Sequence, residues 1–156
     1  MNSREIVKNL NTFNPLKNIF LGVKAVNELP KTQIQEKCWC IVSNCCPRDL
    51  PGEHWVSIFC ENNKIEFFDS YGLPPQFFDG IDTFLSAQQT NGMNKECVFN
   101  NQQLQSFDTP VCGHYCILYL KSRANNMSFE RFMYILLNMD RDLLVKSIVN
   151  SDFGIY

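Results

Sequence analysis

Apolar residues along the chain fall into two kinds of run, which predict strands and helices respectively. Short runs rich in β-branched and aromatic residues predict strands at 39–43, 54–60, 64–69 and 97–99. Asn62 and Asn63 separate the second run from the third, so a tight turn is expected to pair these two strands antiparallel.

Apolar residues at helical spacing predict helices at 4–10, 77–89, 111–123, 128–138 and 140–150. Ser3 is the expected cap of the first helix. Residues 11–29 are mixed, and Pro15, Gly22 and Pro30 predict mostly loop there. The order of elements predicts a single α+β domain over residues 1–156, a small mostly antiparallel sheet packed by helices.

Composition narrows the class of protein. The chain has 156 residues, of which 45% are hydrophobic, and a net charge of −2, so bulk charge does not favour nucleic-acid binding. The first ten residues lack the apolar core of a signal peptide, and no stretch reaches the length of a membrane span. We therefore expect the eight cysteines to lie in a reducing compartment, the cytosol or nucleus, in a protein that is not secreted.

Cys112 is the first candidate for chemistry. It follows Pro110 at the start of the apolar run 111–123, and a helix N-terminus lowers the pKa of a thiol. Gly113 leaves the backbone room beside a reacting carbon. The alternative is that Cys112, like Cys116, is a buried structural cysteine.

The chain has two histidines, and His54 is the better candidate for a base. It begins a predicted strand, and Asp69 ends the strand paired with it, so the carboxylate could orient the imidazole. A turn-forming role for Asp69 is the alternative. Trp55 points to the opposite face, as core or as a wall of the site. His114 is two residues from Cys112 on the same helix, on a different face, and is expected to be structural or to line the substrate site.

A side-chain amide could stabilise an oxyanion together with the N–H of the nucleophile residue. Gln102, Gln103 and Gln105 all precede Cys112 and are candidates for that donor. A zinc site is a further alternative for four clustered cysteines. Buried thiols are the default for that cluster, because adjacent cysteines cannot easily face one metal. The cluster comprises Cys38, Cys40, Cys45 and Cys46.

Three blocks of sequence resemble the adenovirus-type, or adenain-like, cysteine endopeptidases. They are G-E-H-W-V-S-I-F at 52–59, F-F-D-S-Y-G-L-P-P at 67–75 and Q-S-F-D-T-P-V-C-G-H-Y-C at 105–116. The likeness is closest to the short versions found in Polinton/Maverick elements, adintoviruses and related DNA viruses. It implies a fold shared with SUMO-specific proteases, with the nucleophile at the start of a buried central helix.

The resemblance implies a role for each matching residue. Cys112 would be the nucleophile, His54 the general base, Asp69 the orienting acid and Gln105 the oxyanion donor. Trp55 and Gly113 would contact substrate. The family cleaves viral precursor proteins at Gly-containing sites during virion maturation. This implies a thiol protease made in the infected cell, in its nucleus or cytoplasm, and a candidate for packaging in the virion. We expect a monomer.

Several points depart from the adenovirus pattern. The chain is shorter, it has Asp69 where adenovirus enzymes typically have Glu, and its acidic balance argues against stimulation by DNA. Cys97 lies near the position of the cysteine that bonds an activating peptide, so such a peptide is a candidate partner. No cofactor is expected for the chemistry. A ubiquitin- or SUMO-like deconjugase and an inactive protease-fold binding module remain as alternatives.

Overall fold

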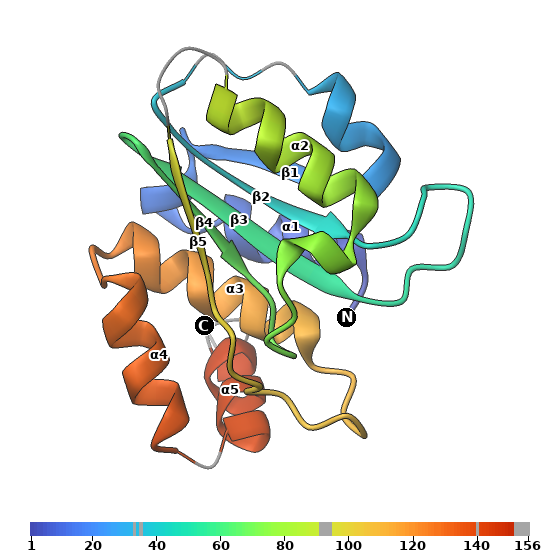
Figure 1. Ribbon diagram of the computed structural model, residues 1–156. Helices are drawn as coiled ribbons and strands as arrows, with labels where there is room; N and C mark the ends of the chain where they lie inside the picture. The colour runs from blue at the N-terminus through green and yellow to red at the C-terminus, as the bar shows by residue number, and fades with distance from the viewer. Residues whose placement is uncertain (33, 35, 91–94, 140, 152–156) are drawn as a thin grey trace.

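The computed structural model describes residues 1–32, 34, 36–90, 95–139 and 141–151, which build a five-stranded sheet packed by helices on both faces (Figure 1). The strands lie in sequence order, and their bounds are β1 Phe20–Ala25, β2 Cys38–Asn44, β3 Trp55–Glu61, β4 Lys64–Phe68 and β5 Glu96–Phe99. The central strands β2, β3 and β4 pair antiparallel, whereas β1 and β5 join the two edges in parallel. The sheet is therefore mixed, with the expected antiparallel pairs at its centre.

The helices surround this sheet unevenly. Helix α2 and the short 3₁₀ helix η2 (Val26–Lys31) cover one face, and the other α-helices lie on the opposite face (Figure 1). The bounds are α1 Ser3–Asn11, α2 Asp79–Thr90, α3 Cys112–Ala124, α4 Phe129–Leu137 and α5 Arg141–Ser151. In the part of the chain that the structure describes, no helix has the length and apolarity needed to cross a membrane.

Alternation along the strands creates two cores. On β2, Cys40 and Val42 face α1, α3, α4 and α5, while Trp39 and Ile41 face α2. This follows from the two-residue period of a strand, and both faces are apolar because both are covered. Helix α3 is the central helix of the larger core, and Cys112 is its first residue. The predicted α+β fold, with the candidate nucleophile heading a buried central helix, is confirmed.

Two local predictions were wrong. The cap of α1 is Asn2 rather than Ser3, because the Asn2 side chain accepts from the Glu5 N–H while Glu5 bonds back to the Asn2 N–H. The region 11–29 is not mostly loop, since it contains β1 and short 3₁₀ turns. Gly22, read as loop punctuation, lies within β1 at φ +99°, where the register with β2 shifts. Asp140, the expected start of the last helix, lies outside the described residues.

Candidate active site

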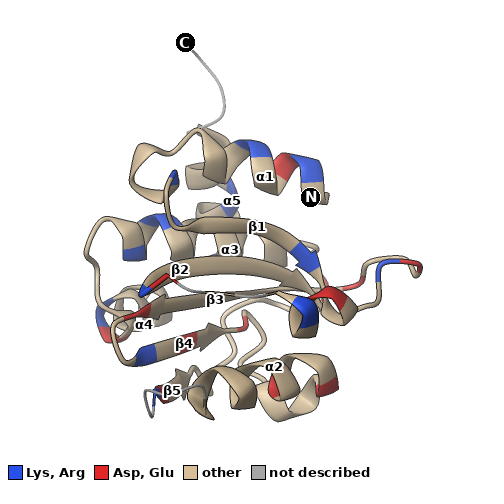
Figure 2. Cartoon of the chain, turned by 90° about the horizontal axis from the view of Figure 1, so that it is seen from above, with Lys and Arg blue, Asp and Glu red and all other residues tan. Residues whose placement is uncertain are grey.

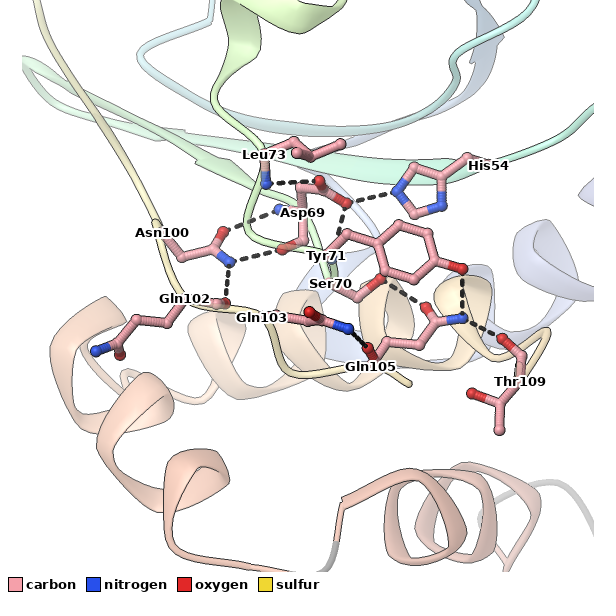
Figure 3. A network of polar contacts seen from close by, with 10 residues as sticks. All are labelled: His54, Asp69, Ser70, Tyr71, Leu73, Asn100, Gln102, Gln103, Gln105 and Thr109. Carbon is pink, nitrogen blue, oxygen red and sulfur yellow. Dashed lines mark hydrogen bonds and ion pairs between the residues drawn. The ribbon is translucent and has the colours of Figure 1, made fainter. Parts of the chain in front are cut away.

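The antiparallel pair β3–β4 brings His54 and Asp69 together. His54 immediately precedes β3 and Asp69 immediately follows β4, so the turn at 62–63 places both residues at the same end of the hairpin. The imidazole Nε2 lies 2.5 Å from Asp69 Oδ1 (Figure 3). The structure therefore places the two residues as the hairpin prediction requires.

The Asp69 carboxylate is fully buried (0% exposed) and is held by the turn that follows it. Its Oδ1 accepts from the Tyr71 N–H at 3.2 Å, and its Oδ2 accepts from the Leu73 N–H at 3.0 Å. Gly72 makes this turn possible with φ at +72°, a conformation that suits glycine. The turn therefore fixes the carboxylate and supplies a hydrogen bond to each of its buried oxygens.

Cys112 joins this pair from the start of α3, with 9% of its surface exposed. Burial raises the pKa of its thiol, but the His54 side chain and the backbone N–H groups of Trp55 and Gly113 outweigh burial and lower the pKa below its ordinary value. Burial also opposes charge on His54, yet its contacts with Asp69 and Cys112 raise its pKa to about 9. Both shifts favour an ion pair of thiolate and imidazolium.

The ring orientation of His54 fits this pairing. Its Nε2 is occupied by Asp69, and Nδ1 makes no hydrogen bond among the described residues, although Cys112 lies near enough to raise the pKa of the ring. Nδ1 is therefore the ring atom left to exchange a proton with the sulfur. Chemically, such an arrangement can serve as a nucleophile, a base and a group that orients the base.

Gln105 lies beside these residues and is almost fully buried (1% exposed). Its Oε1 accepts from the Ser70 hydroxyl at 2.7 Å, and its Nε2 donates to the Thr109 carbonyl and, at 3.2 Å, to the Tyr71 hydroxyl (Figure 3). The rival Gln103 is exposed and donates to the Gln105 carbonyl at 2.8 Å. The structure thus distinguishes Gln105 from its neighbours Gln102 and Gln103 by burial and by its place in the lining of the cleft over Cys112.

Asn100 is a site residue that sequence analysis missed. Its Nδ2 donates to the Asp69 carbonyl at 2.6 Å, and its Oδ1 accepts from the Asp69 N–H at 3.0 Å (Figure 3). It fixes the backbone of the acid from the end of β5. The only signal in the sequence was a polar residue directly after a short strand, which is too common to identify it.

A cleft of about 430 Å³ opens over Cys112. Tyr71 stacks on the His54 ring with centroids 4.7 Å apart, and Phe107 stacks on Tyr71 at 5.3 Å. Trp55 lines the cleft as well, is half-buried against the larger core, and donates its indole N–H to the Met1 carbonyl at 3.2 Å. Trp55 is thus both part of the core edge and a wall of the cleft.

The remaining predicted residues are not among those that line this cleft. Gly113 is buried, and a side chain added there would meet Met1 at 3.2–3.3 Å. His114 is buried on α3, and burial lowers its pKa. Cys97 is half-buried on the edge strand β5, where burial raises its pKa to about 11. Among the residues that the structure describes, no three His, Cys, Asp or Glu side chains gather in a way that could hold a metal ion.

Comparisons with known proteins agree on the fold. No protein-family model matches the chain, and no curated protein matches it in sequence. Among solved structures, the ASFV pS273R protease is similar over all of this chain and 68% of its own, with a TM-score of 0.65 and 17% identity. ChlaDub1 from Chlamydia trachomatis is similar over 97% of this chain and 91% of its own, with a TM-score of 0.65 and 12% identity. A de-sumoylating protease is similar over 98% of this chain and 73% of its own length, with a TM-score of 0.52 and 14% identity. The chain has the fold that these proteases share.

Proposed function

We propose that the protein is a cysteine endopeptidase that uses Cys112 as its nucleophile. One observation carries this proposal: Cys112 heads a buried helix beside His54, whose other ring nitrogen lies 2.5 Å from the buried Asp69. A buried acid holding an imidazole beside a thiol of lowered pKa is costly to maintain and suits covalent catalysis. The fold shared with known proteases supports the same reading.

The chemistry would proceed by acyl transfer. The Cys112 thiolate attacks the carbonyl carbon of the scissile peptide bond, and the imidazolium of His54 then gives its proton to the departing amine. A water that loses a proton to His54 attacks the resulting thioester. This step releases the acid product and restores the thiolate.

The oxyanion formed in each step would lie between Gln105 Nε2 and the backbone N–H of Cys112. The first N–H groups of a helix have no acceptor within the helix, so α3 offers its own donors there. One Nε2 hydrogen of Gln105 is bonded to the Thr109 carbonyl, and the other faces the Tyr71 hydroxyl at the comparatively long distance of 3.2 Å. The oxyanion would take the place of Tyr71 as acceptor.

The substrate we propose is a precursor protein cut at a Gly-containing site, as the resemblance to adenovirus-type enzymes implies. The cleft supports small residues beside the scissile bond, because three large rings border it. These rings belong to Trp55, Tyr71 and Phe107. A role in virion maturation follows from the resemblance, and an activating peptide bound through Cys97 remains a prediction.

The distribution of charge argues against DNA as an activator. Figure 2 shows Lys and Arg interspersed with Asp and Glu over the elements in view, without a continuous basic stripe. A protein that follows a phosphate backbone needs such a stripe. This observation supports the expectation drawn from the net charge.

The test is hydrolysis of fluorogenic peptides that contain Gly-Gly or Gly-Ala pairs. We expect the wild-type protein to cleave them and Cys112→Ala to be inactive. Cys116→Ala, which removes a buried thiol one turn further along α3, is the matched control and should retain cleavage. Equal cleavage by Cys112→Ala and wild type would reject the proposal.

A deconjugase is the second candidate, because the structures with a similar fold include a de-sumoylating protease. Probes that carry an electrophile at the C-terminus of ubiquitin or SUMO distinguish the two functions. Labelling of Cys112 by such a probe, together with slow cleavage of the free peptides, would favour the deconjugase. Rapid cleavage of the peptides without labelling supports the endopeptidase.

A further inference from the structure

A carboxylate outside the predicted site binds the loop that carries Gln105. Asp142, on the first turn of α5, accepts from the Ser106 N–H at 3.0 Å and from the Thr109 hydroxyl at 2.5 Å, both through Oδ2. Its Oδ1 accepts from the Tyr115 hydroxyl at 2.7 Å. One side chain therefore joins three points that are distant from it in sequence.

These contacts lead directly to the amide of Gln105. The Thr109 carbonyl accepts a hydrogen bond from Gln105 Nε2, so the position of Thr109 sets the direction of that amide. Ser106 is the next residue in the chain, so both bonds to Asp142 Oδ2 flank the Gln105 side chain. The loop otherwise exposes much of its surface, including Phe107, which is 78% exposed.

The third contact connects the loop to the helix of the nucleophile. Tyr115 is fully buried on α3, three residues after Cys112, and its hydroxyl also lies 3.2 Å from the Leu104 carbonyl. Asp142 thus bonds to α3 and to the loop at the same time. The distance between Cys112 and the Gln105 amide depends on that connection.

We propose that Asp142 is a positioning residue, which holds the Gln105 amide in register with the start of α3 so that its N–H meets the oxyanion. The inference rests on the proposed peptidase function and deepens it. An oxyanion donor acts only when it is fixed in advance at the place where charge develops. A loop free to move would lose that benefit while leaving the thiolate intact.

A plainer explanation is that Asp142 only stabilises the first turn of α5, where an acidic residue is favourable. The two roles predict different defects. A helix-stabilising residue affects every property of the folded protein alike. A positioning residue affects reactions that pass through an oxyanion and leaves simple alkylation of the thiol unchanged.

The experiment compares Asp142→Ala with wild type in three assays. These are peptide hydrolysis, inhibition by a peptide aldehyde ending in Gly, and alkylation of Cys112 by iodoacetamide. The thiolate adds to the aldehyde carbonyl to give a tetrahedral hemithioacetal, which needs the oxyanion donor, whereas alkylation displaces iodide and does not. Leu143→Ala is the matched control, because Leu143 is the next residue of the same helix and is 76% exposed.

We expect Asp142→Ala to lower kcat and aldehyde affinity by at least about tenfold, with an upper bound of about 10²–10³-fold for loss of the donor itself. KM and the alkylation rate should stay within about twofold of wild type. Asp142→Asn should restore activity to within about threefold. Its carbonyl can accept from Ser106 and Thr109, and its amide can donate to the Tyr115 oxygen while Tyr115 donates to the Leu104 carbonyl.

Thr109→Val tests the same contact if Asp142→Ala does not fold, because it removes one hydroxyl at nearly constant volume. We expect Thr109→Val to weaken binding of the peptide aldehyde and to leave the alkylation rate unchanged. Unchanged aldehyde affinity in the folded variant, or an alkylation rate that falls in proportion to kcat, would overturn the assignment of Asp142 alone. A wild-type protein that neither cleaves peptides nor binds the aldehyde would reject the proposed function, and the role of Asp142 with it.

Discussion

Replacement of His54 by Ala tests the electrostatics of the site. In the wild type, burial raises the pKa of the Cys112 thiol, and the His54 contact is the largest effect that lowers it. Removing the imidazole takes away this effect and leaves the effect of burial on the thiol. We therefore expect the thiol of His54→Ala to have a pKa at or above the ordinary value of about 8.5.

The magnitude follows from the ionised fraction. A thiol of pKa about 8.5 is about 3% ionised at pH 7, so about 30-fold is the upper bound on the loss of thiolate. A thiolate of lower pKa is intrinsically the weaker nucleophile, which offsets part of this loss. We expect alkylation of Cys112 by iodoacetamide at pH 7 to slow by about tenfold. Peptide hydrolysis should fall further, by about 10³-fold or more, because acid–base catalysis is also lost.

The assay is the alkylation rate as a function of pH, followed by mass spectrometry of the Cys112 peptide. The wild-type rate should reach its plateau at a lower pH than the rate of the variant, because His54 lowers the pKa of the Cys112 thiol. Hydrolysis by the wild type should decline above pH 9, because His54, with a pKa of about 9, then loses the proton needed by the leaving amine. His114→Gln is the matched control. Equal alkylation rates for His54→Ala and wild type at pH 7 would refute the ion-pair reasoning.

Three further predictions concern the supports of the site. Asp69→Asn should lower kcat strongly, by at most about 10⁴-fold, because the orienting acid is lost. The CD spectrum should stay unchanged, and full activity would contradict the orienting role of Asp69. Gly72→Ala should cost more stability in urea unfolding than Gly22→Ala. Both glycines have positive φ, but only at Gly72 would the added Cβ come within 2.6 Å of backbone; equal losses would contradict this. Arg123→Leu should destabilise the fold by about 1–3 kcal/mol, because the buried Glu66 loses a guanidinium 2.6 Å away and keeps the Tyr119 hydroxyl and Lys64 at 3.6 Å; an unchanged free energy of unfolding would contradict it.

The sequence predicted those parts of the site that follow from local pattern. The hairpin from 54 to 69 could be derived, because two apolar runs flank a two-residue Asn turn. Such a turn brings the start of the first run next to the end of the second. The position of Cys112 at a helix start could also be derived from Pro110 and the apolar run after it. These features depend on neighbours in sequence.

Other parts depended on contacts between distant residues. Asn100 and Asp142 bind the site through bonds that span 31 to 36 positions, and nothing in their own neighbourhoods marks them. Strand β1 was missed because Gly22 interrupts its pattern and because it is completed by parallel pairing with β2. The preference for Gln105 over Gln103 came from the family resemblance, whereas the structure supplies its physical reason in burial.

The most direct test of the account is the identity of the covalent intermediate. Wild-type protein would be mixed with a Gly-ending peptide ester, quenched in acid within milliseconds to seconds, digested and measured by mass spectrometry. The account predicts an acyl adduct on the peptide that contains Cys112, which disappears as hydrolysis is completed. Turnover of the ester without an adduct, or an adduct confined to another cysteine such as Cys97, would contradict it.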